Sequence, residues 1–254
     1  MLPLRLGELT TEACAALLQS PNPTVLLPVG STEPHGPHLP LATDALLSEE
    51  VCVRAARALR DRGVTAVAAP TLPYGVTRYA RDFAGATSLS AETTARVIEE
   101  LLGAWRAMGF ACACVVNNHL EPEHVEALAR GVARVPGAVF ANQLTRRWGR
   151  TLSAEFKRGD CHAGCYETSL VLAARPDLVR DDLRAGLAPV PISLSDAIRA
   201  GRTTFVEMGA ARGYFGAPAE GTVAEGEAMY ARLVEMVVTE VREALGLAEG
   251  EAGA

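Results

Sequence analysis

Acidic and imidazole side chains, the groups that bind transition metals or move protons in catalysis, gather in one short stretch of this chain. That stretch is residues 24–44, TVLLPVGSTEPHGPHLPLATD. Its apolar beginning predicts a buried strand, and Glu33, His35 and Asp44 follow in a loop stiffened by prolines. Residues two apart on an extended segment point the same way, so Glu33 and His35 can face one ion. Asp44 also has a plainer interpretation, as the N-cap of the next helix.

Two later segments carry the same kinds of side chain. His119 and Glu121 follow an apolar run at 110–116, with the same spacing as the first pair. Nitrogen and oxygen ligands together suit zinc, manganese or iron better than calcium. Five such ligands exceed what a four-coordinate catalytic zinc needs, and they suit two divalent ions that share a carboxylate and a hydroxide. The candidate ligands are Glu33, His35, Asp44, His119 and Glu121, and a third polar segment, 159–168, adds His162 and Glu167.

The elements that must position these residues follow from hydrophobic periodicity. Strand, polar loop and helix succeed one another more than once, which indicates parallel strands, crossover helices and a site at the carboxyl ends of the strands. We predict an α/β fold with one domain over 1–246 and a disordered tail at 247–254. The predicted strands are 24–29, 64–69, 110–116 and 138–141, and the predicted helices are 45–60, 91–108, 122–134, 145–157, 169–174 and 223–246.

Composition excludes several classes of function. Of the 254 residues, 49% are hydrophobic, enough for a substantial core, and the formal net charge is −6. There is no basic stripe with interleaved aromatics, so we expect no nucleic acid partner. No apolar run approaches the length of about 20 residues that a membrane span needs, and the N-terminus lacks the apolar core of a signal peptide. We therefore expect a soluble, cytoplasmic protein with no membrane role.

Six cysteines are present, and four of them lie in apolar patterns typical of reduced, buried thiols. Cys161 and Cys165 flank His162, which is compatible with a zinc knuckle or a thiol nucleophile. No second pair of cysteines completes a zinc site of that kind. The acid and imidazole cluster is therefore the stronger candidate.

Several of these segments resemble the creatininase family. GSTEPHGPHLPLATD (30–44) is similar to the family signature, NNHLE (117–121) to its second metal motif, and HAGCYETS (162–169) to a third block. PTLPYGVTRYARDFAGATSLS (70–90) and ARGYFGAPAEGTVAEG (211–226) also resemble family segments. The resemblance implies a three-layer α/β/α fold with a mostly parallel sheet and a site for divalent metals. It further implies hydrolysis of an amide bond in a small molecule by a homo-oligomer, often a hexamer.

The resemblance also implies how the metals are held. Glu33, Asp44 and His119 would bind one ion, and His35, Asp44 and Glu121 the other, so that Asp44 bridges the pair. Glutamate at position 121 resembles creatininase itself, whereas many family members have glycine there. Two ions per chain, of zinc, manganese or iron, are therefore expected.

His162 corresponds to the catalytic histidine of the family, and Glu167 to a nearby active-site glutamate. The expected reaction is hydrolysis, in which a metal-bound hydroxide attacks the carbonyl carbon and His162 protonates the departing nitrogen. Glu167 either orients His162 or joins the metal shell. Glu121 counts among the catalytic residues as a ligand.

Around the expected pocket the chain departs from creatininase. Leu120 stands where creatininase has an aromatic residue, and Arg158 and Asp160 lie where it has a tryptophan-bearing stretch. Thr77 and Arg78 belong to the irregular segment 70–87, whose length is typical of a functional loop. These five residues are the candidates for substrate binding. The departures predict that arginine and aliphatic side chains replace an aromatic wall, and that an arginine pairs with an anionic group of a substrate other than creatinine.

We therefore expect a metal-dependent amidohydrolase that cleaves a non-peptide, cyclic amide bond of a small molecule. Other enzymes would use the same metals with a different pocket: a formamide deformylase, or a peptidase that trims the peptide precursor of a cofactor or natural product. A family member that binds a ligand without catalysis is a further alternative. Because no position of the ligand set is missing, an enzyme is favoured.

Overall fold

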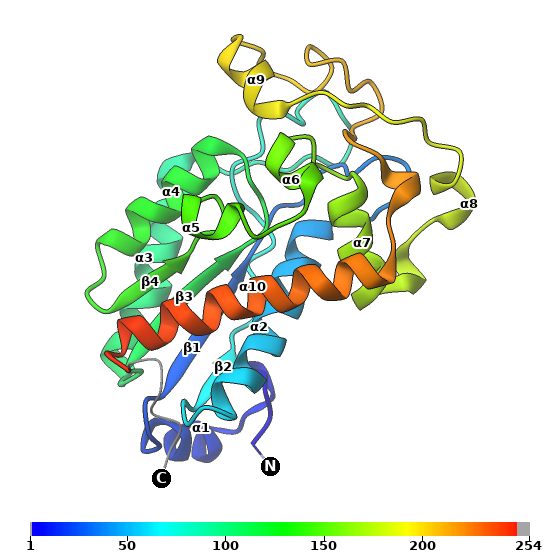
Figure 1. Cartoon of the computed structure of the whole chain (residues 1–254). Helices are drawn as coiled ribbons and strands as arrows, with labels where there is room; N and C mark the ends of the chain where they lie inside the picture. Colours follow the sequence, from blue (N-terminus) through cyan, green and yellow to red (C-terminus); the bar gives the residue numbers. More distant parts are fainter. Residues whose placement is uncertain (1, 248–254) are drawn as a thin grey trace.

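The computed structural model describes residues 2–247 and has a four-stranded sheet at its centre (Figure 1). The strands are β1 (Thr24–Val29), β2 (Ala66–Ala68), β3 (Cys112–Asn117) and β4 (Ala138–Ala141), in the spatial order β2-β1-β3-β4. Each neighbouring pair is parallel. All residues of β1 and β3 are buried, as expected for inner strands covered on both faces. The prediction of an α/β fold with a parallel sheet is confirmed.

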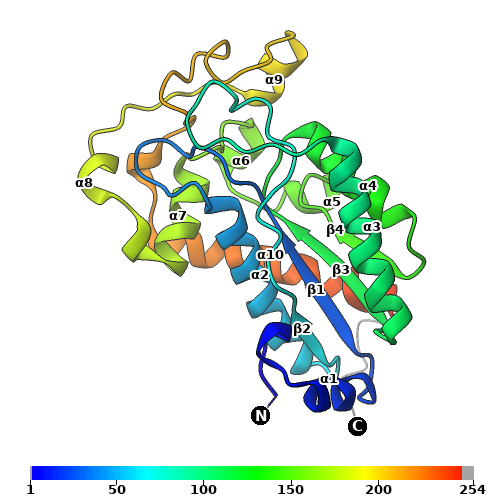
Figure 2. The same cartoon turned by 180° about the vertical axis from the view of Figure 1, so that it is seen from behind.

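Helices cover both faces of this sheet, which gives three layers (Figures 1 and 2). One face carries α2 (Thr43–Arg60), α7 (Cys165–Ala174) and α10 (Val223–Ala244), and the other carries α3 (Ala91–Met108) and α4 (Pro122–Ala133). The side chains of β1 alternate between the two cores. Leu26 belongs to the core under α2 and α10, whereas Val25, Leu27 and Val29 belong to the core under α3 and α4.

Several helix boundaries follow local signals in the sequence. α3 begins after Ser90, whose side chain accepts a hydrogen bond from the N–H of Thr93. It ends at Gly109, which adopts the left-handed conformation that glycine tolerates best. α4 begins with Pro122 at its first position, where the missing N–H costs nothing. At the N-terminus, the turn η1 (Leu6–Glu8) precedes α1 (Thr11–Leu18).

The single helix predicted at 145–157 is wrong. Two short helices are present instead, α5 (Arg146–Gly149) and α6 (Ala154–Arg158), because Ser153 caps α6 by accepting a hydrogen bond from the N–H of Phe156. The helix predicted from Ser169 begins earlier, at Cys165. This difference matters for the site, since it places Glu167 in the first turn of α7.

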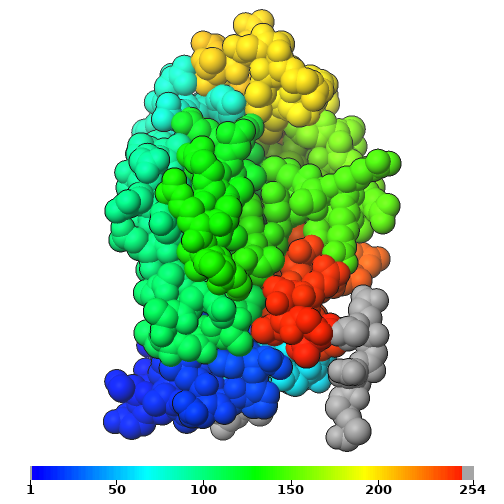
Figure 3. Space-filling view, turned by 90° about the vertical axis from the view of Figure 1, so that its left-hand side faces the viewer, coloured from blue at the N-terminus to red at the C-terminus, as the bar shows by residue number. Residues whose placement is uncertain are grey.

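Loops and short helices lie beyond the carboxyl ends of the strands, among them α9 at the upper end of the molecule (Figures 1 and 3). Here the loop before α3 meets the segment after α9 in a small apolar cluster, the cap cluster, made of Ala80, Phe205, Met208, Ala210 and Phe215. The elements of this region are η2 (Pro176–Leu178), α8 (Asp181–Arg184), α9 (Leu194–Arg199) and η3 (Pro218–Glu220).

Within residues 2–247, no helix is both long and apolar enough to cross a membrane. The tail predicted at 247–254 lies outside the described residues from position 248 onward.

A glycine allows β1 and α2 to meet closely at the end of the strand. A Cβ atom on Gly30 would lie 2.4 Å from the backbone nitrogen of Ala45 and 2.7 Å from the carbonyl carbon of Asp44. Only a residue without a side chain fits there, because such contacts are far inside van der Waals distance. The close approach brings Asp44, in the first turn of α2, directly beside the end of the central strand.

We therefore expect Gly30→Ala to lower the free energy of unfolding by about 1–3 kcal/mol through overpacking, and to weaken metal binding by displacing Asp44. Chemical denaturation and metal titration would measure both effects. Gly103→Ala is the matched control, since a Cβ there meets nothing within 4 Å and lies inside α3. It should raise the free energy of unfolding by about 0.5–1 kcal/mol. Equal behaviour of the two variants would contradict the packing argument.

Candidate metal centre

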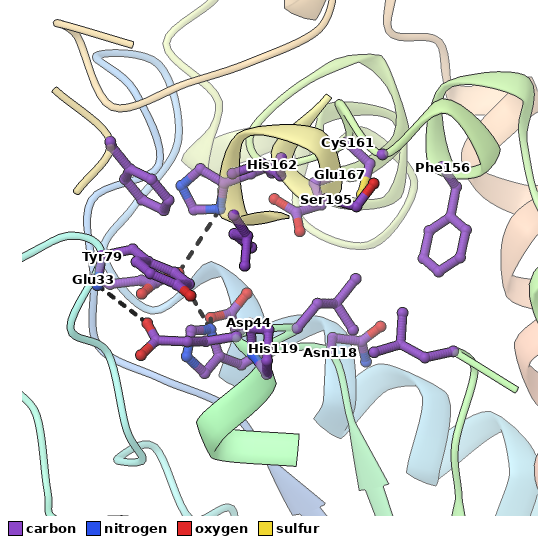
Figure 4. A pocket seen from close by; sticks show the side chains of 18 residues that line it. Glu33, Asp44, Tyr79, Asn118, His119, Phe156, Cys161, His162, Glu167 and Ser195 are labelled. Atoms are coloured by element: carbon purple, nitrogen blue, oxygen red, sulfur yellow. Dashed lines mark hydrogen bonds and ion pairs between the residues drawn. The ribbon is translucent and has the colours of Figure 1, made fainter. Parts of the chain in front are cut away.

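Six acidic and imidazole side chains converge beyond the carboxyl ends of β1 and β3. The loop after β1, the first turn of α2, the segment after β3, and the loop before α7 with the first turn of that helix each contribute. Figure 4 labels five of the six. His162 and Glu167 lie on one side of the site, and Glu33, Asp44 and His119 lie opposite them. The six residues are Glu33, His35, Asp44, His119, His162 and Glu167, and each is less than one-tenth exposed.

Asp44 connects two groups within this cluster. Its Oδ1 lies 3.1 Å from His35 Nε2, and its Oδ2 lies 3.2 Å from His119 Nδ1. The same His119 nitrogen is 3.2 Å from Glu33 Oε1, while His35 Nε2 is 3.4 Å from Glu167 Oε2. Each oxygen of Asp44 thus faces a different imidazole, and each of these imidazoles faces a second carboxylate.

The three histidines are held in the same manner. The outer ring nitrogen of each lies against a backbone carbonyl: His35 Nδ1 is 3.1 Å from the oxygen of Glu33, His119 Nε2 is 2.7 Å from that of Val76, and His162 Nε2 is 3.1 Å from that of Pro34. A carbonyl only accepts hydrogen bonds, so each outer nitrogen carries the proton. In the neutral rings the lone pair therefore points inward, which is how second-shell carbonyls orient metal-binding histidines.

This arrangement fits divalent metal ions. Candidate ligand atoms within 4.8 Å of one another form three groups: Glu33, Asp44 and His119; His35, Asp44 and Glu167; and Glu33, His35 and His162. Asp44 Oδ2 is buried without a hydrogen-bond partner among the described residues. Inward lone pairs and carboxylate oxygens repel one another unless a proton or a cation lies between them. The mixed nitrogen and oxygen donors suit zinc, manganese or iron.

The pKa values reflect this crowding of charge. Burial opposes a charge on His35, but the carboxylates of Asp44 and Glu167 outweigh burial and raise its pKa to about 10. The pKa of His119 is likewise raised, against burial, by Glu33 and Asp44. For Glu167, burial dominates and raises the pKa to about 8. For His162, burial and then the nearby His35 lower the pKa to about 4, so this ring is neutral at pH 7.

The predicted ligand Glu121 makes different contacts in this structure. Its carboxylate accepts hydrogen bonds from the backbone N–H groups of Arg78, at 2.9 and 3.0 Å, and of Tyr79, at 3.2 Å. It belongs to none of the candidate ligand groups among residues 2–247, whereas Glu167 belongs to one. Glu121 therefore holds the loop at 78–79 against the site, and its role as a ligand stays a prediction.

Sequence reasoning missed His124, a fully buried residue of α4. Its Nδ1 accepts a hydrogen bond from the N–H of Val76 at 3.2 Å, so its Nε2 donates to Asn117 Oδ1 at 3.1 Å. The carbonyl of Val76 orients His119, and the side chain of Asn117 bonds the backbone of His119 at both its N–H and its carbonyl. His124 therefore braces His119 from two sides. Its position on the buried face of a helix is typical of core residues, so the sequence contains no signal for this role.

The five predicted substrate-binding residues lie in different surroundings. Thr77 donates a hydrogen bond to Glu33 Oε2, and so supports the cluster. Leu120 lines the cavity. Arg78 is largely exposed and pairs with Glu123 at 3.1 Å, and Arg158, also exposed, lies 3.4 Å from the buried Asp160. Neither arginine is among the residues that line the cavity, and their part in substrate binding stays a prediction.

The cavity beside the cluster has a volume of about 230 Å³. Its polar floor is formed by Asn118 and by the cluster residues other than His35, and its walls are largely apolar. The expected loss of aromatic walls is wrong in part, because Tyr79, Phe156 and Phe205 all line the cavity. Phe205 lies with its ring centroid 4.5 Å from that of His162. Phe205 belongs to the cap cluster, and no local sequence pattern predicts that it lies beside His162. The remaining lining residues are Leu120, Glu121, Pro122, Leu144, Gly159, Cys161, Leu194, Ser195 and Ile198.

The two cysteines around His162 lie in surroundings that disfavour a thiolate. Burial raises the pKa of Cys161 well above its usual value. Burial, together with a hydrogen bond to Glu225, raises the pKa of Cys165 to about 12. Neither thiol belongs to a candidate ligand group among the described residues. Protonated thiols are poor nucleophiles, so these pKa values weigh against the thiol alternative.

This chain is similar to known proteins in both sequence and fold. The family model described as "Creatininase: creatinine amidohydrolase" matches residues 7–241. The mycofactocin precursor peptide peptidase of Mycobacterium ulcerans (strain Agy99) is 34% identical over 247 residues, covering 93% of this chain and 91% of that protein. The creatinine amidohydrolase of Pseudomonas putida is 27% identical over 193 residues, covering 68% and 72%. A solved structure named "Creatininase Mn" superimposes with a TM-score of 0.75 at 23% identity, covering 94% of this chain and 98% of that one.

The bracing of His119 leads to a prediction. His124→Ala should weaken metal binding by about 10-fold, in the range for loss of residues that orient ligands. The reason is that Val76 and Asn117 both lose a partner. Metal titration by calorimetry measures the effect. Leu128→Ala is the matched control, because Leu128 is equally buried in α4 but packs in the apolar core. It should destabilise the fold and leave the affinity of folded protein for metal nearly unchanged; a similar loss of affinity in both variants would refute the bracing role.

Proposed function

The chain belongs to the creatininase family of hydrolases, and from that premise we propose that it is a metal-dependent peptidase that cleaves an amide bond in a short peptide. The observation that carries the proposal is the similarity, over 93% of the chain, to a protein named as a precursor peptide peptidase. It favours the peptidase among the alternatives that the sequence left open. The non-peptide cyclic amide is the less supported substrate, since the creatinine amidohydrolase is less similar.

The geometry supports two ions per chain. Glu33, Asp44 and His119 would hold one ion, and His35, Asp44 and Glu167 the other. Asp44 would bridge them, because its two oxygens face different histidines. When bound, such ions polarise a carbonyl oxygen and lower the pKa of a water molecule toward neutrality.

His162 is positioned to carry the proton that amide hydrolysis must move. Its Nε2–H is held by the carbonyl of Pro34, and its Nδ1, 3.7 Å from Glu33 Oε1, faces the cluster. The lowered pKa of the ring leaves Nδ1 unprotonated at pH 7. The attacking water gives a proton to Nδ1, its oxygen bonds to the carbonyl carbon, and Nδ1–H then protonates the nitrogen as the C–N bond breaks. Phe205 packs against the His162 ring at an interplanar angle of 40° and helps to shield the ring from bulk water.

The cavity supports a substrate with an apolar side chain next to the scissile bond. Its walls combine aromatic and aliphatic side chains, and its volume of about 230 Å³ is too small for a folded protein segment. A short, flexible peptide can place one apolar residue against these walls while its carbonyl reaches the cluster.

We expect Asp44→Ala to abolish binding of both ions, because both groups lose a ligand. Glu167→Ala should lose one ion and keep the other. Elemental analysis after reconstitution with zinc or manganese gives the stoichiometry. Glu121→Ala, analysed in parallel, tests the prediction from the family resemblance. In the geometry described it retains two ions, and loss of one would assign Glu121, rather than Glu167, to the metal shell.

The function is tested with pentapeptides Gly-Ala-X-Ala-Gly in which X is Phe, Leu, Asp or Lys, and with creatinine. We expect cleavage of the Phe and Leu peptides, little of the Asp and Lys peptides, and poor turnover of creatinine. His162→Ala should keep its metals and lose about 10²–10⁴-fold in kcat. Mass spectrometry identifies the cleaved bond. Turnover of creatinine at an ordinary rate with no cleavage of any peptide would overturn the peptidase proposal, and Cys161→Ser should stay active.

A further inference from the structure

One polar atom on the floor of the cavity has no partner. Asn118 lies between β3 and His119, is 3% exposed, and lines the cavity. Its Oδ1 is buried and accepts no hydrogen bond from any residue in the described part of the chain. Leaving a buried acceptor unpaired costs about 1–3 kcal/mol, so such an atom in a cavity calls for a partner from outside the protein.

The orientation of the Asn118 amide follows from its neighbour Ser48. Ser48 Oγ lies 2.6 Å from the carbonyl oxygen of Val29, to which it must donate its only hydrogen. Ser48 Oγ therefore acts as an acceptor for the backbone N–H of Asn118 and for Asn118 Nδ2, both at 3.0 Å. Because Nδ2 is committed to Ser48, the oxygen of the amide must point the other way. Figure 4 shows it directed toward the side of the cavity where Phe156 and Cys161 lie.

The surroundings give this acceptor a specific use. The walls near it are mostly apolar, the charged groups of the cluster are engaged with one another, and the carboxylate of Glu121 is engaged with the N–H groups of Arg78 and Tyr79. Asn118 directly precedes His119, so a substrate whose carbonyl reaches the cluster brings its adjoining atoms over Asn118. In a peptide those atoms include a backbone N–H, which is a hydrogen-bond donor without charge.

We propose that Asn118 Oδ1 accepts a hydrogen bond from a backbone N–H of the substrate next to the scissile bond, and that Asn118 thereby selects substrates with a free N–H at that place. This inference rests on the proposed function and deepens it, since it names the part of the peptide that is recognised. A site that pairs a substrate N–H discriminates strongly against an analogue without it, because the protein's own polar group is then left unpaired.

The test is a cycle of two enzymes and two kinds of peptide. The peptides are Gly-Ala-Phe-Ala-Gly and its analogues methylated at one backbone nitrogen at a time. For one methylation site we expect the metal-loaded protein to lose about 10–100-fold in kcat/KM. Asn118→Leu, which has a similar shape and no acceptor, should cleave the parent peptide about 10–100-fold more slowly and show a much smaller further loss on methylation. The cycle removes the steric effect of the methyl group, which both enzymes share.

Two further variants sharpen the cycle. Leu144→Ala alters the same cavity without touching a hydrogen bond, so it should affect parent and methylated peptides alike. Ser48→Ala keeps Asn118 Oδ1 but removes the hydrogen bond that orients the amide. It should therefore discriminate less between the parent and methylated peptides. Metal content is measured for every variant, so that loss of His119 as a ligand is recognised separately.

The outcomes distinguish this inference from the proposed function. If the protein cleaves the peptides but Asn118→Leu retains the full methylation effect, the role of Asn118 is refuted and the peptidase stands. If no peptide is cleaved, the peptidase proposal fails. The role of Asn118 is then tested by calorimetry, which compares the affinities of the parent and methylated peptides for the protein and for Asn118→Leu. Equal affinity of parent and methylated peptides, or no binding of either, would overturn the inference.

Discussion

The geometry of the site depends on three buried carboxylates and two imidazoles that stay in contact with one another while shielded from water. Glu33, Asp44 and Glu167 lie against His35 and His119 at 3.1–3.4 Å. Burial alone would drive protons onto the acids and off the rings, since charges are costly in the interior. The opposite signs of the partners reverse that tendency for His35 and His119, whose pKa values are raised. The carboxylates can stabilise divalent cations in place of these protons. The cluster therefore suits metal ions.

Much of the surrounding structure serves to hold these side chains in place. Thr77 bonds Glu33, and His124 braces His119 through two neighbours. Glu155 of α6 plays a comparable part at the start of α7, where its buried carboxylate accepts hydrogen bonds from the N–H groups of Cys165 and Tyr166. A carboxylate at a helix N-terminus satisfies otherwise unpaired donors. It thereby positions the turn that presents Glu167.

The polar floor and the apolar walls of the cavity have separate origins. The floor comes from strand ends and helix beginnings, which are rigid parts of the fold, whereas Phe205 and Ile198 come from the region beyond the strands. A site built in this way can keep its floor while its walls change. The similarity of this chain both to a peptide peptidase and to a creatinine amidohydrolase fits that division.

The sequence by itself determined the parallel α/β fold and the segments whose acidic and imidazole side chains converge in the structure. Buried strands such as 24–29, and the caps at Ser90, Gly109 and Pro122, depend on residues close together in the chain, and local patterns report them reliably. The break between α5 and α6, from Gly149 to Ser153, was not predicted. The cap at Ser153 outweighs the weak helical periodicity of this segment.

Only the tertiary structure decided which groups meet. Glu167 comes within 3.4 Å of His35 because α7 packs beside α2, and Glu121 faces the loop at 78–79. The protonated nitrogen of each histidine, the brace from His124, the direction of Asn118 Oδ1 and the arrival of Phe205 also depend on contacts between distant segments. Spacing along a chain fixes which face a side chain is on, but distances across the site are set by how helices pack on the sheet.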